Sequence, residues 1–95
     1  MIAVDAARLR EVCERYGIAR LEVFGSVSRG EASDASDVDL LYQLKPGARL
    51  GFRIFDLEDD LVAIFGRPVD LVGRDSINQY IRDEILHEAR PLYAA

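Results

Sequence analysis

Hydrophobic and polar positions follow two different periods along this chain of 95 residues. In three stretches, apolar residues recur every three or four positions, which predicts three amphipathic helices. In three others, apolar and polar residues alternate, which predicts short strands with one buried face. The predicted helices cover residues 4–16, residues 51–65 and the stretch between Ser76 and Pro91, and the predicted strands lie within residues 19–25, 37–44 and 67–72.

The limits of the last predicted helix come from its capping residues. Asp75 or Ser76 is expected at the N-cap, because Ser76 and Gln79 have the spacing of a capping box. Pro91 ends the helix, and the residues from Pro91 onward form a short edge strand or a tail. The apolar positions of this helix predict a buried face made of Ile77, Tyr80, Ile81 and Ile85.

The order of these elements predicts a small α/β domain (α+β) with a mixed β-sheet covered by helices. The length of the chain fits a single domain that spans residues 1–95. The connection between Gly25 and Asp37 is short, which favours antiparallel pairing of the first two strands. This pairing would bring the end of the first strand beside the start of the second.

Composition and charge describe a globular protein without a strong attraction to nucleic acid. The chain is 49% hydrophobic and 31% charged, and its formal net charge of −5 opposes non-specific binding of phosphate backbones. No apolar run approaches the length of about 18 residues that a membrane span needs. The single cysteine, Cys13, fits a reducing compartment. We therefore expect a soluble, cytoplasmic protein with no membrane partner and no strong nucleic-acid binding.

Two aspartates share one face of the second predicted strand. Asp37 and Asp39 are two residues apart, so their side chains point to the same side, roughly 6.6 Å apart along the strand. Carboxylates in this arrangement repel each other, and burial without a partner is costly. One interpretation is a solvated face, with Asp37 in the preceding turn. The other is a bound divalent cation, because Leu41 continues the same face and carboxylate oxygens suit Mg²⁺ or Mn²⁺.

A third aspartate strengthens the metal interpretation. Asp70 lies between Val69 and Leu71 in the third predicted strand. Together with Asp37 and Asp39, it would complete a carboxylate cluster able to hold two metal ions about 4 Å apart.

The glycine–serine pair that precedes these aspartates also has two interpretations. Gly25 and Ser26 can form a strand-to-helix turn in which Ser26 is the N-cap. Alternatively, the backbone N–H groups of the turn hold phosphates that the metal ions bridge from the other side. A P-loop is excluded, because Glu31 and Ala32 stand where its Lys and its Ser or Thr are required. The second interpretation makes this a nucleoside-triphosphate site.

The stretch FGSVSRGEASDASDVDLLY, residues 24–42, followed by Asp70, resembles the signature of the polymerase-beta-like nucleotidyltransferases. Within that superfamily, the chain is similar to the minimal nucleotidyltransferases, including the MntA-type antitoxins that pair with HEPN-domain toxins. The resemblance implies the nucleotidyltransferase fold and a set of site residues. These are Gly25, Ser26 and Arg29 for the nucleotide, and Asp37, Asp39 and Asp70 for catalysis and for two Mg²⁺ ions. Arg29 fits a solvated loop arginine equally well.

The resemblance also implies an activity. It indicates a Mg²⁺-dependent enzyme that transfers AMP from ATP, or from another nucleoside triphosphate, to a tyrosine hydroxyl of a partner HEPN toxin. Such an enzyme would act as a type VII antitoxin, and Mn²⁺ would substitute for Mg²⁺. The alternative is a catalytically silent binding module with the same fold, which neutralises its partner by steric masking. Three converging carboxylates favour the enzyme, since masking has no need of them.

Overall fold

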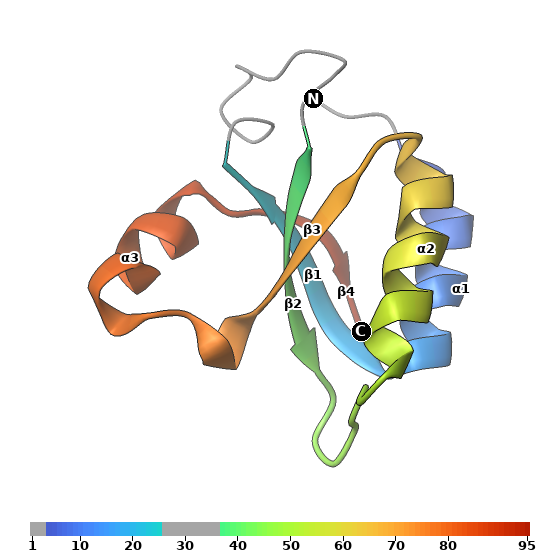
Figure 1. Cartoon of the computed structure of the whole chain (residues 1–95), viewed down its shortest axis with the longest axis horizontal. Helices are drawn as coiled ribbons and strands as arrows, with labels where there is room; N and C mark the ends of the chain where they lie inside the picture. Colours follow the sequence, from blue (N-terminus) through green and yellow to red (C-terminus); the bar gives the residue numbers. More distant parts are fainter. Residues whose placement is uncertain (1–3, 26–36) are drawn as a thin grey trace.

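The computed structural model describes residues 4–25 and 37–95, and these contain three α-helices and four strands (Figure 1). The elements are α1 (Ala6–Tyr16), β1 (Ile18–Phe24), β2 (Val38–Leu44), α2 (Arg53–Phe65), β3 (Val69–Gly73), the 3-10 turn η1 (Arg74–Ser76), α3 (Gln79–Glu88) and β4 (Arg90–Ala94). The predicted α/β class and element order are confirmed, and residues 91–94 belong to the edge strand β4. None of the helices in this part of the chain has both the length and the apolar character that a membrane span requires.

The four strands form one mixed sheet in the order β3-β2-β1-β4. β1 pairs antiparallel with β2 and with β4, whereas β2 and β3 run parallel. The predicted antiparallel pairing of the first two strands is therefore correct. Because β2 and β3 are parallel, the chain must cross over between them, and α2 forms this crossover.

Two helices cover one face of the sheet, and the third lies on the other side (Figure 1). Side chains alternate between the two faces along β2, which makes the faces different. Val38 and Leu40 are buried in the core under α1 and α2, while Asp39 points to the opposite face. Cys13 of α1 belongs to this core, where burial above all, with the neighbouring charge of Glu14, raises the pKa of its thiol to about 12. The other buried members of this core are Leu9, Val12, Tyr16, Ile18, Leu21, Val23, Leu50, Leu57, Leu61, Phe65 and Val69.

Polar contacts at the end of α1 join it to α2. The Tyr16 hydroxyl donates a hydrogen bond of 2.7 Å to Oδ2 of Asp60, and Arg15 lies 3.4 Å from the same oxygen. The guanidinium of Arg53 lies over the Tyr16 ring, 4.9 Å from its centroid, and donates to the Arg15 carbonyl. These contacts fix the two helices to each other on the same face of the sheet.

The predicted start of the last helix is wrong. Asp75 and Ser76 lie in η1, and the N-cap of α3 is Asn78, whose side chain accepts a hydrogen bond of 2.9 Å from the N–H of Tyr80. The chain needs η1 and the extended Ile77 to turn away from β3 before it can enter a helix. Sequence spacing alone does not reveal this turn.

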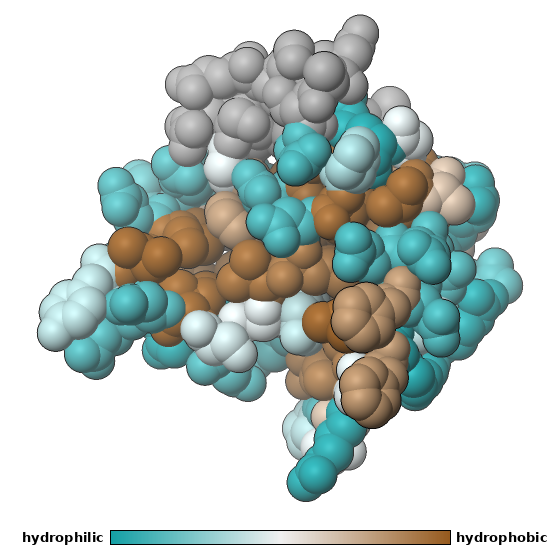
Figure 2. Space-filling view, viewed as in Figure 1, coloured by the Kyte–Doolittle hydropathy of each residue, from teal (hydrophilic) through white to brown (hydrophobic). Residues whose placement is uncertain are grey.

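The buried face of α3 also differs from the predicted one. Ile77 is buried, as predicted, and Ile85 packs against the sheet, but Tyr80 and Ile81 are 86% and 47% exposed. A small apolar cluster, which includes Leu41, attaches α3 to the sheet. Apolar surface remains visible between α3 and the strands (Figure 2). This face of the sheet is therefore covered far less completely than the other.

Buried and exposed apolar residues of α2 should contribute differently to the stability of the fold. Leu57 is fully buried, so Leu57→Ala should lower the free energy of unfolding by about 2–5 kcal/mol through lost burial and a residual cavity. Phe55 on the same helix is 63% exposed, and Phe55→Ala should change stability by no more than about 0.5 kcal/mol. Urea denaturation of both variants measures the difference. Equal losses would contradict the assignment of Leu57 to the core.

Candidate active site

Two of the three predicted aspartates lie side by side on the face of the sheet that α3 partly covers. The parallel register of β2 and β3 pairs Asp39 with Asp70, and Val38 with Val69. Neighbouring strands are about 4.8 Å apart, so paired residues present adjacent side chains. Because the two valines are buried, both aspartates must point to the opposite face.

Gly25 completes this corner of the sheet. It follows the last residue of β1, Phe24, which is the strand partner of Asp39. Gly25 has a φ of 74°, a backbone conformation that residues with a Cβ rarely adopt. A Cβ at this position would also overlap Oδ2 of Asp39. The Asp39 carboxylate therefore lies directly against the glycine backbone, and glycine is favoured here for two independent reasons.

Of the three remaining predicted site residues, the structure describes only Asp37. Asp37 is exposed and precedes β2, whose first residue Val38 donates a backbone hydrogen bond of 2.9 Å to the Pro68 carbonyl. Across residues 4–25 and 37–95, no three His, Cys, Asp or Glu side chains are placed to hold one metal ion. The three-carboxylate metal site thus stays a prediction. Ser26 and Arg29 lie outside the described residues, so their proposed roles also stay predictions.

The neighbouring surface comes from α3 and the strands beneath it. Phe24, next to Gly25, packs into the same apolar cluster as Leu41 and Val72. Leu41 is two residues after Asp39, and Val72 is two residues after Asp70, so the cluster adjoins the aspartates on the same face. One side of the candidate site is therefore apolar and adjacent to α3.

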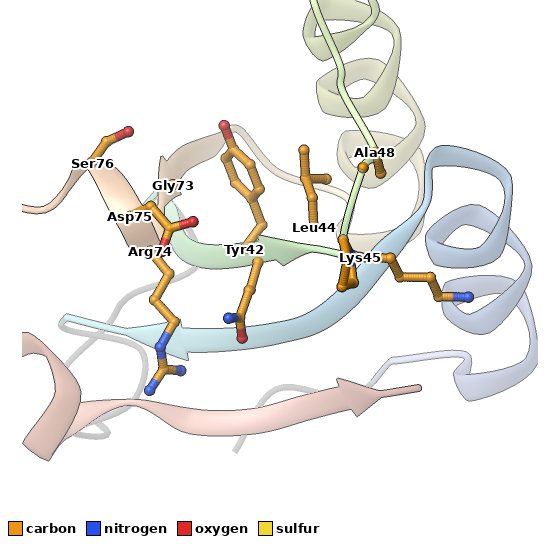
Figure 3. Close-up of a pocket in the computed structure, with 11 residues that line it drawn as sticks. Tyr42, Leu44, Lys45, Ala48, Gly73, Arg74, Asp75 and Ser76 are labelled. Carbon is orange, nitrogen blue, oxygen red and sulfur yellow. The ribbon is translucent and has the colours of Figure 1, made fainter.

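The described residues contain a separate pocket at the other end of β2 and β3 (Figure 3). It has a volume of about 370 Å³, and Tyr42, Lys45, Gly73 and Ser76 are among the residues that line it. Tyr42 is three residues beyond Asp39, which corresponds to about 10 Å along the strand. This pocket is thus distinct from the aspartate corner.

One residue near the aspartates was missed by the sequence pattern. Glu22 alternates with the core residues of β1 and so suggests a solvated position, yet it is only 5% exposed. Arg74, 52 residues away in sequence, contacts its carboxylate at 2.5 Å. The one indication in the sequence that Glu22 belongs near the aspartates is that it shares a face of β1 with Phe24, the strand partner of Asp39.

The sequence model described as "Nucleotidyltransferase domain" matches residues 8–92, which include Gly25 and all three aspartates. The chain belongs to the nucleotidyltransferase domain family. This membership confirms the predicted enzyme class.

Individual nucleotidyltransferases support the same assignment. The chain is 39% identical over 86 residues to protein adenylyltransferase MntA of Thermococcus cleftensis. The aligned region covers 90% of this chain and 86% of the relative. A solved structure described as a minimal nucleotidyltransferase is 36% identical and superposes with a TM-score of 0.75, covering 90% of this chain and 87% of the other. The chain is therefore a minimal nucleotidyltransferase homologous to MntA-type protein adenylyltransferases.

A more distant structural neighbour extends the likeness in fold. It is a complex of a tri-AMPylated Shewanella oneidensis HEPN toxin with an MNT antitoxin. The superposition has a TM-score of 0.65 at 15% identity, and it covers 95% of this chain and 70% of the other. The predicted nucleotidyltransferase fold is confirmed.

Two glycines with similar backbone conformations offer a matched test of the contact between Gly25 and Asp39. Gly66 has a φ of 73°, and a Cβ there would meet nothing within 4 Å. Gly25→Ala and Gly66→Ala should each destabilise the fold by about 1–2 kcal/mol through left-handed strain. Only Gly25→Ala should also displace the Asp39 carboxylate and lower nucleotide transfer about 100-fold. Equal transfer rates in the two variants, measured with folded protein, would contradict a catalytic position for Asp39.

Proposed function

We propose that this nucleotidyltransferase is a protein adenylyltransferase that moves AMP from ATP to a tyrosine hydroxyl of a HEPN-domain toxin, and so acts as its antitoxin. The observation that carries the proposal is the pairing of Asp39 with Asp70 beside Gly25, within a chain homologous to protein adenylyltransferase MntA. The neighbour in which an MNT antitoxin accompanies a tri-AMPylated HEPN toxin supports the choice of acceptor.

The aspartates fit the divalent cations that the proposal requires. Carboxylate oxygens are the ligands that Mg²⁺ and Mn²⁺ prefer, and Asp39 and Asp70 present theirs from paired positions on one face. Asp37, exposed just before β2, would add a third carboxylate. When bound, two Mg²⁺ ions would offset the negative charge that develops on the attacking and leaving oxygens.

The residues of the chain itself would hold and orient the two substrates. Gly25 has no side chain, so a triphosphate can approach the backbone at the end of β1, where Ser26 and Arg29 would bind it. Asp70 is exposed on the edge strand β3, which suits a group that meets an incoming acceptor. Its carboxylate would orient the tyrosine hydroxyl or accept its proton.

In the transfer itself, the hydroxyl oxygen forms a bond to the α-phosphorus of ATP. The bond between the α-phosphorus and its bridging oxygen to the β-phosphate breaks, and pyrophosphate leaves. The hydroxyl proton passes to the carboxylate that orients the acceptor. Since the chain carries a net charge of −5, a polynucleotide acceptor is disfavoured and a protein hydroxyl is favoured.

A change at Asp39 tests the metal site. Asp39→Asn should abolish Mn²⁺ binding in isothermal titration and Mg²⁺-dependent transfer. Without metal, the same variant should be as stable as the wild type or more stable by about 0.2–1 kcal/mol, because repulsion with Asp70 is relieved. Asp59→Asn, the same change at an exposed position of α2, is the control and should bind Mn²⁺ normally. Equal Mn²⁺ binding by wild type and Asp39→Asn would exclude the proposed site.

A second experiment separates transfer from steric masking. The protein is incubated with a HEPN toxin encoded beside it, ATP and Mg²⁺, and the toxin is weighed by mass spectrometry. We expect the toxin to gain the mass of one or more AMP groups on a tyrosine and to lose its activity. The Asp37→Asn/Asp39→Asn variant should produce neither effect. Equal inhibition by this variant, without added mass, would instead support masking.

A further inference from the structure

Glu22 and Arg74 form a largely buried ion pair on the face of the sheet that carries Asp39 and Asp70. Within the described ranges, Glu22 is the charged side chain that is buried, and its carboxylate lies 2.5 Å from Nη1 of Arg74. Nε of Arg20, on the same strand, lies 3.4 Å from the same carboxylate oxygen. A buried carboxylate is tolerated only when it is paired in this way.

The pair spans the strand that carries Asp39. The register places Glu22 opposite Leu41, and Leu41 opposite Val72, so these three residues form one row across β1, β2 and β3. Asp39 and Asp70 form part of the adjacent row on the same face, one side-chain step away, or about 6.6 Å. Arg74, two residues beyond Val72, reaches back across β2 to β1 in this row.

Of the two strands that carry the aspartates, β3, which Arg74 follows, is held less securely than β2. β3 is a five-residue edge strand, and β2 is its one neighbour in the sheet. Asp70 is exposed on it, while Asp39 lies on the central strand β2. The spacing of the two carboxylates therefore depends on how firmly β3 is fixed against β2.

We propose that Glu22 and Arg74 are positioning residues for the active site. Their ion pair fixes the end of β3 to β1, across β2, and so holds Asp70 beside Asp39. This assignment rests on the proposed metal site, since it concerns the geometry of two of its ligands.

A positioning role and a purely structural role of this ion pair predict different effects on Mn²⁺ binding, so an experiment can separate them. Replacing both members of a buried ion pair with apolar side chains of similar size often leaves stability unchanged, whereas removing one member strands a buried charge. Arg74→Met should therefore lower the unfolding temperature, because the buried Glu22 carboxylate would keep only the more distant and more exposed Arg20, and Glu22→Met/Arg74→Met should restore it. If the pair positions Asp70, the double variant should still bind Mn²⁺ about tenfold more weakly than the wild type, as expected when a group that orients a ligand is lost.

The experiment is an isothermal titration of Mn²⁺ into the folded wild type and variants, well below their unfolding temperatures. Amide hydrogen exchange of Val72, whose N–H faces β2 in the parallel register, gives an independent measure. We expect it to be faster in the double variant because β3 is less firmly held. Glu11→Met is the control, since it removes an exposed ion pair with Arg15 on the far helix α1. It should change neither measurement.

The outcomes distinguish this proposal from the proposed function. If the wild type binds Mn²⁺ and Asp39→Asn does not, the metal site stands. If Glu22→Met/Arg74→Met then binds Mn²⁺ as tightly as the wild type, with unchanged exchange at Val72, the positioning role is overturned and the metal site is not. If the wild type and Asp39→Asn bind equally, the metal site itself fails.

Discussion

The parallel register between β2 and β3 is the constraint on which the active site depends. Val38 and Val69 are paired and buried against α1 and α2, so the next residue of each strand must point to the opposite face. Because side chains alternate along a strand, a slip of β3 by one residue against β2 would bury Asp70 and expose Val69. The core therefore selects the register. Asp39 and Asp70, which repel each other, are brought together by the burial of their neighbours.

The two faces of the sheet are packed unequally, and the site lies on the less packed one. Most of the buried side chains belong to the face under α1 and α2, whereas α3 is attached through a small cluster that includes Leu41 and Ile77. Regions with few buried apolar contacts open at lower free-energy cost than a core does. The aspartates thus stand on strands fixed by the core, next to a helix that can move more easily. A displacement of α3 would therefore leave the strands that carry Asp39 and Asp70 in place.

The sequence predicted those parts of the structure that are determined locally. Strand alternation placed Asp39 and Asp70 on polar faces, and a short connection indicated that β1 and β2 pair antiparallel. The start of α3 was mispredicted because Ser76 fits a capping box, while the actual cap, Asn78, depends on the turn that η1 makes after β3. The ion pair of Glu22 with Arg74 was invisible for a related reason. Its partners are 52 residues apart, and only the assembled sheet brings them together.

The placement of the carboxylates favours an enzyme over a masking module. Two adjacent like charges weaken a sheet, and the fold reduces this cost without removing it. Asp70 is exposed on an edge strand, where water screens it, and Asp39 lies against Gly25, which has no side chain. The exposed position of Asp70 also leaves its carboxylate accessible to a cation. A protein that acted only by covering its partner would have no need of two carboxylates at paired strand positions, and this pairing supports the proposed cation site.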